Sequence, residues 1–123
     1  MPKNAVVIVS ADADHTRYLV ETLAGCEVQL FQDPAQALAA AVAAKPPVVI
    51  VDDDKFPSGE PLAFVAELRA AGVKASILLV LPHGQVERPR QAELQFDILD
   101  KPVKADGLTD WMTLAVMQAR MRR

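Results

Sequence analysis

The stretch Pro47-Val-Val-Ile-Val-Asp-Asp-Asp-Lys-Phe-Pro57 decides the fold of this chain. Its four consecutive β-branched residues, Val48 to Val51, are typical of a strand buried on both faces of a parallel sheet. Three carboxylates, Asp52 to Asp54, follow at the carboxyl end of the run, the edge where open α/β sheets collect ligands and chemistry. Adjacent acids repel one another unless a cation or a lysine offsets their charge. A solvated acidic turn is the alternative that these residues alone leave open.

Four other segments predict strands. Ala5 to Val9 and Ile77 to Leu81 are apolar throughout, so we expect them to lie beside Val48 to Val51 in the buried centre of a sheet. Glu27 to Phe31 alternates polar and apolar residues, which is typical of a strand nearer the sheet edge. Phe96 to Leu99 is the last short strand.

Helices are predicted between the strands. The first runs to Ala24 with an apolar stripe of Leu19, Val20 and Leu23, and Asp33-Pro34 opens an alanine-rich helix through Ala44. Pro61 favours a helix start, and the helix after it is expected to bury Leu62, Val65 and Leu68 and to end at Gly72. The final helix is expected from about Ala105 to Met121. Residues 85 to 95 contain Pro89 and predict a short or irregular helix.

This pattern alternates strand and helix five times, so it predicts a single α/β domain over residues 1–123 with a doubly wound parallel sheet. The chain is 51% hydrophobic and 24% charged, as in globular domains. Its net charge of −3 gives no support to nucleic-acid binding. A single cysteine, Cys26, favours a cytoplasmic location, and no apolar run approaches membrane-spanning length.

Two motifs then resemble a known family. Asp53 follows the central strand and Pro57 lies four residues further on, and Lys101-Pro102 follows the fifth strand. Together with five βα units in order, these motifs resemble the response-regulator receiver domain of two-component signalling over nearly the whole chain. The resemblance implies a flavodoxin-like (βα)5 fold with strand order 2-1-3-4-5. It also implies that Asp53 occupies the phosphoacceptor position and that Lys101 contacts the phosphoryl group.

Other positions depart from the family. Receivers hold Mg²⁺ with two acids at the end of the first strand, where this chain has Ser10 and Ala11; Asp12 matches the next position, which is often also acidic. Leu81 stands where the family has a Ser or Thr that senses the phosphoryl group, and Ile98 stands at its switch aromatic. Asp12 and Asp53 remain as metal ligands, so we expect Mg²⁺ binding to be weak or absent.

We therefore expect Asp53 not to be appreciably phosphorylated by small phosphodonors. Lys101 is expected to pair with Asp53 instead, with Lys55 reaching back toward the carboxylates, and the Lys101-Pro102 bond is expected to be cis, as it commonly is in the family. His15 opens the first helix and has no partner at metal-ligand spacing.

Three functions stay open from the sequence. The first is an atypical receiver that has no enzyme activity and acts as a protein-interaction module, its partner a histidine kinase or another signalling protein. The second is a working receiver phosphorylated at Asp53 by a histidine kinase. The third is a flavodoxin-like domain that binds a small ligand at the same sheet edge, although no phosphate-cradling glycine loop is present.

The final helix carries two apolar faces. Leu108, Trp111, Met112, Ala115 and Ala119 fit a face packed on the sheet, whereas Leu114, Met117 and Met121 lie on a second face. A second apolar face predicts a contact surface, either for a homodimer or for a partner, in the region that receivers commonly use. One broad buried stripe with incidental methionines is the alternative.

Overall fold

The computed structural model describes residues 4–82 and 95–121, which form five strands and four helices. In chain order these elements are β1 (Ala5–Val9), α1 (Ala13–Thr22), β2 (Glu27–Phe31), α2 (Pro34–Ala44), β3 (Val48–Asp52), α3 (Pro61–Ala70), β4 (Ser76–Leu81), β5 (Asp97–Asp100) and α4 (Ala105–Met121). The helix expected at residues 85 to 95 lies largely outside the described residues. None of the helices in the described part of the chain is both long enough and apolar enough to cross a membrane.

All five strands are parallel and lie in the order β2-β1-β3-β4-β5, which confirms the predicted topology. Every residue of β3 and β4 is buried, whereas β2 at the sheet edge is exposed or half-buried along its whole length. The fully apolar runs therefore form the centre of the sheet and the alternating run forms its edge, as the sequence indicated.

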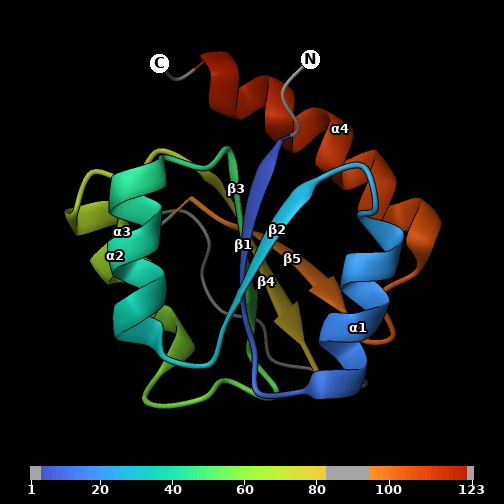
Figure 1. The fold of residues 1–123 in the computed structure, drawn as a ribbon, viewed down its shortest axis with the longest axis horizontal. Helices are drawn as coiled ribbons and strands as arrows, with labels where there is room; N and C mark the ends of the chain where they lie inside the picture. Colours follow the sequence, from blue (N-terminus) through green and yellow to red (C-terminus); the bar gives the residue numbers. More distant parts are fainter. Residues whose placement is uncertain (1–3, 83–94, 122–123) are drawn as a thin grey trace.

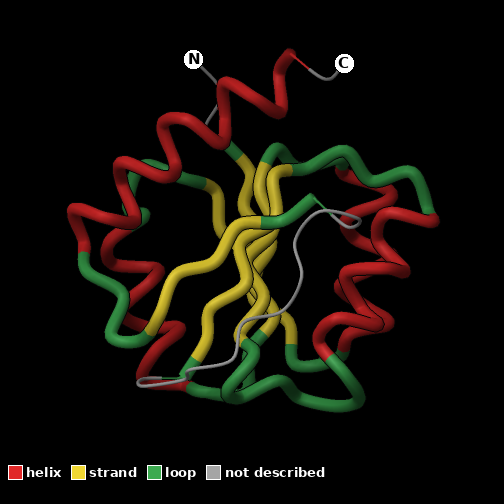
Figure 2. Tube along the Cα trace, turned by 180° about the vertical axis from the view of Figure 1, so that it is seen from behind, coloured by secondary structure: helices red, strands yellow, loops and turns green. Residues whose placement is uncertain are grey.

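Helices cover both faces of the sheet (Figure 1). α2 and α3 pack on one face and α1 and α4 on the other, with the strands stacked between them in Figure 2. Each face has its own apolar cluster because neighbouring side chains of a strand point to opposite sides. In β3, Val49 and Val51 join the cluster under α2 and α3, while Val48 and Ile50 join the cluster under α1 and α4.

Local sequence signals fix two helix starts. Asp12 caps α1 by accepting a hydrogen bond from the His15 backbone N–H at 3.1 Å. Asp33 caps α2 in the same way through the Ala35 N–H at 2.9 Å, and Pro34 occupies the first turn. These two carboxylates satisfy N–H groups that a helix start leaves without partners.

The bounds of three strands, β3, β4 and β5, differ by one residue from the prediction. β3 continues one residue beyond the apolar run, because Asp52 pairs with Val80 of β4 and is only 1% exposed. β5 begins one residue later than expected, at Asp97, although Phe96 before it is still buried. The first difference matters for function because it places a carboxylate inside the sheet.

The predicted helix stripes need two corrections. Val20 is 37% exposed, so the buried side of α1 consists of Leu19 with Leu23 just after the helix. In α3 the buried residues are Phe64, Val65 and Leu68, while Leu62 is only partly buried.

Candidate functional site

The candidate site lies where β1, β3 and β5 end, and its centre is Asp52. The Ser10 hydroxyl, directly after β1, donates to Asp52 Oδ2 at 2.7 Å, and the Lys55 backbone N–H donates to Asp52 Oδ1 at 3.1 Å. Ser10 is itself buried, and its Oγ accepts the Asp12 N–H at 3.0 Å. A buried carboxylate is stable only when such donors replace water, and both oxygens of Asp52 have them.

Lys101 supplies the positive charge of the site. Its Nζ lies 3.0 Å from Asp52 Oδ2, 3.3 Å from Asp12 Oδ2 and 3.4 Å from Asp54 Oδ2. The backbone N–H of Lys101 donates to the Leu81 carbonyl at 2.8 Å, which fixes the residue at the end of β5. The Lys101–Pro102 peptide bond is cis, as the resemblance implied. One ammonium group is thus held by three carboxylates: Asp12 at the start of α1, Asp52 at the end of β3, and Asp54 just after it.

His15 of α1 closes the site from the helix side. Its side chain is 9% exposed, and Nδ1 lies 3.4 Å from Asp52 Oδ2. Neither ring nitrogen has a hydrogen-bond partner among the described residues. His15 therefore has the partner at this edge that the sequence did not reveal.

Two carboxyl groups are held in their ionised form. Burial alone would raise the pKa of Asp52, but its contacts with His15, Ser10, the Lys55 N–H and Lys101 outweigh burial and lower the pKa well below its ordinary value. The His15 N–H, together with Lys101, lowers the pKa of Asp12. Burial lowers the pKa of Lys101, but Asp52 and Asp12 more than offset it, so the pKa is raised.

Asp53 behaves in the opposite way. Burial first, and then repulsion from Asp52, Asp54 and Glu60, raises its pKa. Its backbone N–H donates to the Val80 carbonyl at 2.8 Å, directly after the end of β3. Glu60, which repels Asp53, precedes α3, whereas His15, which contacts Asp52, belongs to α1. These neighbours agree with side chains of Asp52 and Asp53 that face opposite sides of the sheet.

The expected ion pair between Lys101 and Asp53 is wrong. The ion pairs of Lys101 with described residues go to Asp12, Asp52 and Asp54. Lys101 reaches the carboxylates on the α1 side of the sheet because β3 extends through Asp52 and turns that side chain toward Ser10 and His15. Lys55 contributes its backbone N–H to Asp52.

The other family positions are placed as follows. Ala11 is exposed, and its N–H donates to the Lys55 carbonyl at 2.7 Å. Leu81 is fully buried at the end of β4, and Ile98 of β5 is partly buried against the same apolar cluster. Among the described residues, no three His, Cys, Asp or Glu side chains are arranged to hold a metal ion.

Solved structures with the same fold are numerous. A response-regulator receiver domain from Clostridium thermocellum matches with a TM-score of 0.84 and 19% identity, over 98% of this chain and 99% of that one. A CheY-like receiver domain from Methylobacillus flagellatus matches with a TM-score of 0.78 and 21% identity, over 92% and 98%. The chain has the receiver fold.

A third similar structure is full-length FixJ from B. japonicum, with a TM-score of 0.78 and 29% identity. The match covers 97% of this chain and 60% of FixJ. By contrast, no protein-family model matches the sequence, and a search of curated proteins finds no match.

Sequence reasoning missed the central residue of this site. The sequence placed Asp52 among three acids at the sheet edge, with a solvated acidic turn as the alternative, yet Asp52 is the most buried of the three. His15, for which the sequence showed no partner at metal-ligand spacing, lies beside it. The sequence signal that could have identified Asp52 was the alternation of side chains along β3, together with the residue at which the strand ends. If β3 ends one residue later, alternation puts Asp52 on the same face as Ile50, toward α1 and His15.

Proposed function

We propose that this chain is a receiver-like signalling domain that acts as a protein-interaction module, and that Lys101 occupies the place of the metal ion in its acidic site. The observation that carries this proposal is the position of Lys101 Nζ, within 3.4 Å of carboxylate oxygens from Asp12, Asp52 and Asp54. An internal ammonium held in this way offsets part of the acids' negative charge permanently, whereas a metal ion would do so reversibly.

The donor set does not fit Mg²⁺. This ion requires near-octahedral oxygen ligands about 2.1 Å away, usually carboxylates and water. Ser10 and Ala11 supply no carboxylate, and Asp52 Oδ2 already accepts hydrogen bonds from Ser10 Oγ and Lys101 Nζ. The remaining acid, Asp53, has a raised pKa because of burial first and then repulsion from Asp52, Asp54 and Glu60. Mg²⁺ binding is therefore weak or absent.

Phosphorylation at Asp53 is impaired for the same reason. Transfer of a phosphoryl group to a carboxylate depends on positioning and on neutralising the charge of the transferring oxygens. Leu81 has no hydroxyl to bind those oxygens, and Ile98 has no polar tip to move inward as a reporter. The site is accordingly held in one state.

A module held in one state signals through what it binds. Its partner is a histidine kinase or another signalling protein, and the outer face of α4 is the candidate contact surface, for a partner or for a second copy of the chain. Leu114, Met117 and Met121 are 60%, 55% and 82% exposed, and together they form an apolar stripe.

Intact mass spectrometry after incubation with acetyl phosphate and Mg²⁺ tests the proposed impairment. We expect no phosphorylated species. A gain of one phosphate that disappears in Asp53→Asn would instead establish a working receiver. The double variant Ser10→Asp, Ala11→Asp is the matched control, because it restores the two acids and should bind Mg²⁺ if those positions are the lost ligands.

A further inference from the structure

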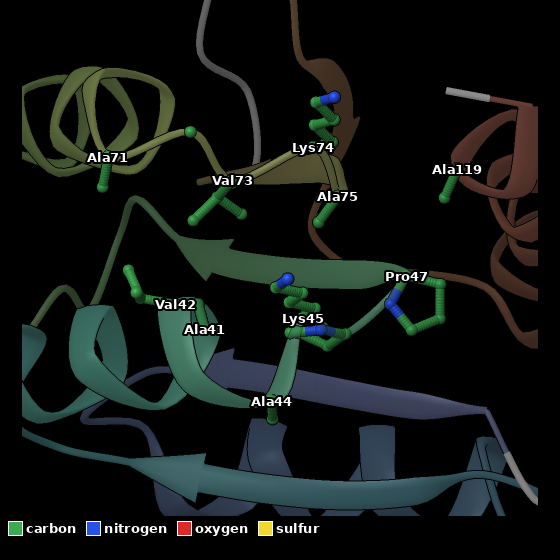
Figure 3. A pocket seen from close by; sticks show the side chains of 12 residues that line it. Ala41, Val42, Ala44, Lys45, Pro47, Ala71, Val73, Lys74, Ala75 and Ala119 are labelled. Carbon is green, nitrogen blue, oxygen red and sulfur yellow. The ribbon is translucent and has the colours of Figure 1, made fainter. Parts of the chain in front are cut away.

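The sheet has an open edge at β2. This strand pairs with β1 on one side, and no described strand lies on its other side. Figure 1 looks onto this edge, where β2 crosses in front of the other strands between α2 and α1. Figure 3, which shows a cavity between the C-terminal ends of α2 and α3, likewise shows β2 outermost, beyond β1. A free edge strand is a template for pairing with another strand.

Two residues of β2 direct their backbone groups to the open side. The Glu27 N–H donates toward β1, to the Asn4 carbonyl at 2.8 Å. At the other end of the strand, the Phe31 carbonyl accepts a hydrogen bond at 3.2 Å from the residue after β1. Backbone groups alternate between the two sides of a strand, so those of Val28 and Leu30 point away from β1. Each of these two residues therefore presents an N–H and a C=O for pairing.

β2 also lacks the features that usually protect an edge strand. Natural edges carry lysine, proline or a β-bulge, which discourage pairing with another chain. The segment Glu27–Phe31 contains neither lysine nor proline, and its pairing with β1 runs without a bulge. On the α1 side of the sheet, Leu30 is 51% exposed, and Val28 packs only partly against the apolar cluster. The open edge thus offers apolar side chains together with backbone groups.

A second copy of β2 complements this strand when the two run antiparallel with Gln29 on a two-fold axis. Val28 then lies opposite Leu30 of the second copy, so apolar side chains meet and both outward-facing residues exchange backbone hydrogen bonds. Gln29 meets its own copy and Glu27 lies opposite Phe31, so no like charges are opposed. An axis at Val28 or at Leu30 would pair only one of the two outward-facing residues within β2.

We propose that two copies of this chain associate through β2, in an antiparallel pair that joins their two sheets into one. The occupant of the open edge is a second copy because the strand matches itself in hydrogen-bonding groups, in apolar side chains and in charge. This contact uses no residue of the outer face of α4. A dimer of this kind therefore goes beyond the function proposed above and leaves Leu114, Met117 and Met121 for a signalling partner.

Disulfide cross-linking tests the pairing and its register. Gln29 and its copy would form a non-hydrogen-bonded pair with Cα atoms about 4.5 Å apart, which a disulfide can bridge. Gln29→Cys in a Cys26→Ala background should therefore give a covalent dimer with oxidised glutathione on non-reducing electrophoresis.

Glu27→Cys in the same background is the matched control, because it lies on the same face of the same strand. Its two copies would be separated by roughly 13 Å along the strands, so it should remain monomeric. Equal cross-linking of the two variants, or no cross-linking of Gln29→Cys, would overturn the proposal.

Leu30→Pro tests the backbone hydrogen bonds. The Leu30 N–H faces away from β1, so proline removes the donor to the second copy and keeps the bonds between β2 and β1. Dimerisation measured by sedimentation equilibrium should weaken by about tenfold or more, while circular dichroism stays native. Leu114→Glu with Met117→Glu should leave the Gln29→Cys cross-link unchanged. Unchanged dimerisation of Leu30→Pro, or loss of the cross-link in the α4 variant, would contradict pairing through β2.

Discussion

At the scale of single residues, the site distinguishes two neighbouring acids. Asp52 is 1% exposed and has Ser10, Lys55, Lys101 and His15 around it. Asp53 follows directly, but burial and then repulsion from Asp52, Asp54 and Glu60 shift its pKa in the opposite direction. One step along a strand thus changes a carboxylate from a stabilising ion-pair partner into a source of repulsion.

Asp52→Asn should destabilise the chain by about 3 kcal/mol, because it leaves Lys101 without the nearest of its three carboxylates inside the protein. Urea unfolding followed by circular dichroism measures this change. Asp54→Asn is the matched comparison: Asp54 is 34% exposed, so losing its contact with Lys101 should cost less than about 1 kcal/mol. Equal losses in the two variants would show that Asp52 is not the principal partner of Lys101.

Asp53→Asn should stabilise the chain at neutral pH, by about 0.5 kcal/mol after allowing for solvent screening. The reason is that the ionised Asp53 is repelled by Asp52, Asp54 and Glu60. The same unfolding measurement checks the sign. A loss of stability instead would mean that Asp53 has a cationic partner in solution.

The pH dependence of stability should separate the two acids. The raised pKa of Asp53 destabilises the folded chain only where the group is ionised, so the advantage of Asp53→Asn should disappear below about pH 3, where the group is protonated in both states. The lowered pKa of Asp52 contributes stability that is fully present above its ordinary value of 3.8 and declines as the pH falls further. Unfolding curves at a series of pH values measure both trends.

At the scale of elements, α4 packs on the sheet with its inner face, and no described residue covers its outer face. Its inner face is fixed by the Ser76 hydroxyl, which donates to the Ala115 carbonyl at 2.8 Å, and by Trp111 Nε1, which donates to Asp97 Oδ2 at 2.9 Å. The sequence predicted both faces of this helix from its periodicity. Among the predicted inner residues only Trp111 is not fully buried, and Val116 joins them.

Leu114→Glu with Met117→Glu should abolish self-association or partner binding through α4 without lowering stability by more than about 0.5 kcal/mol, since both positions are largely exposed. Sedimentation velocity and pull-down of a co-expressed histidine kinase are the readouts. Thr109→Glu adds charge at an exposed α4 position outside the stripe and serves as the control. An unchanged sedimentation profile together with unchanged partner binding would exclude this face as a contact surface.

The positions of the strands could be predicted from the sequence in more detail than the contacts of the site. Val6 to Val9, Val48 to Val51 and Ile77 to Leu81 could be placed at the sheet centre because a strand buried on both faces must be apolar throughout. The ion pairs of Lys101 could not be predicted, because they depend on whether β3 ends at Val51 or Asp52, and element boundaries are the least certain part of a periodic pattern. That single residue decides which acid faces the lysine.

At the scale of the whole molecule, the chain combines the receiver fold with an acidic edge that carries its own cation. The cluster joins β1, α1, β3 and β5, segments far apart in the sequence, through Ser10, His15, Asp52 and Lys101. A charge that ties four elements together stabilises one arrangement of this edge. In the proposed function this is the reason why the domain works through its surfaces and not through a phosphorylation cycle.

The most direct test of this account is the effect of Mg²⁺ on the melting temperature of the wild type and of Lys101→Met, with NaCl at matched ionic strength as the control. If Lys101 holds the place of the metal, Mg²⁺ should leave the wild type unchanged, because its three carboxylates already surround an ammonium group. Lys101→Met should melt at a lower temperature and regain stability with Mg²⁺ beyond the effect of NaCl, because ligand binding to the folded state raises its stability. A wild type that Mg²⁺ stabilises as much as it stabilises Lys101→Met would contradict the account.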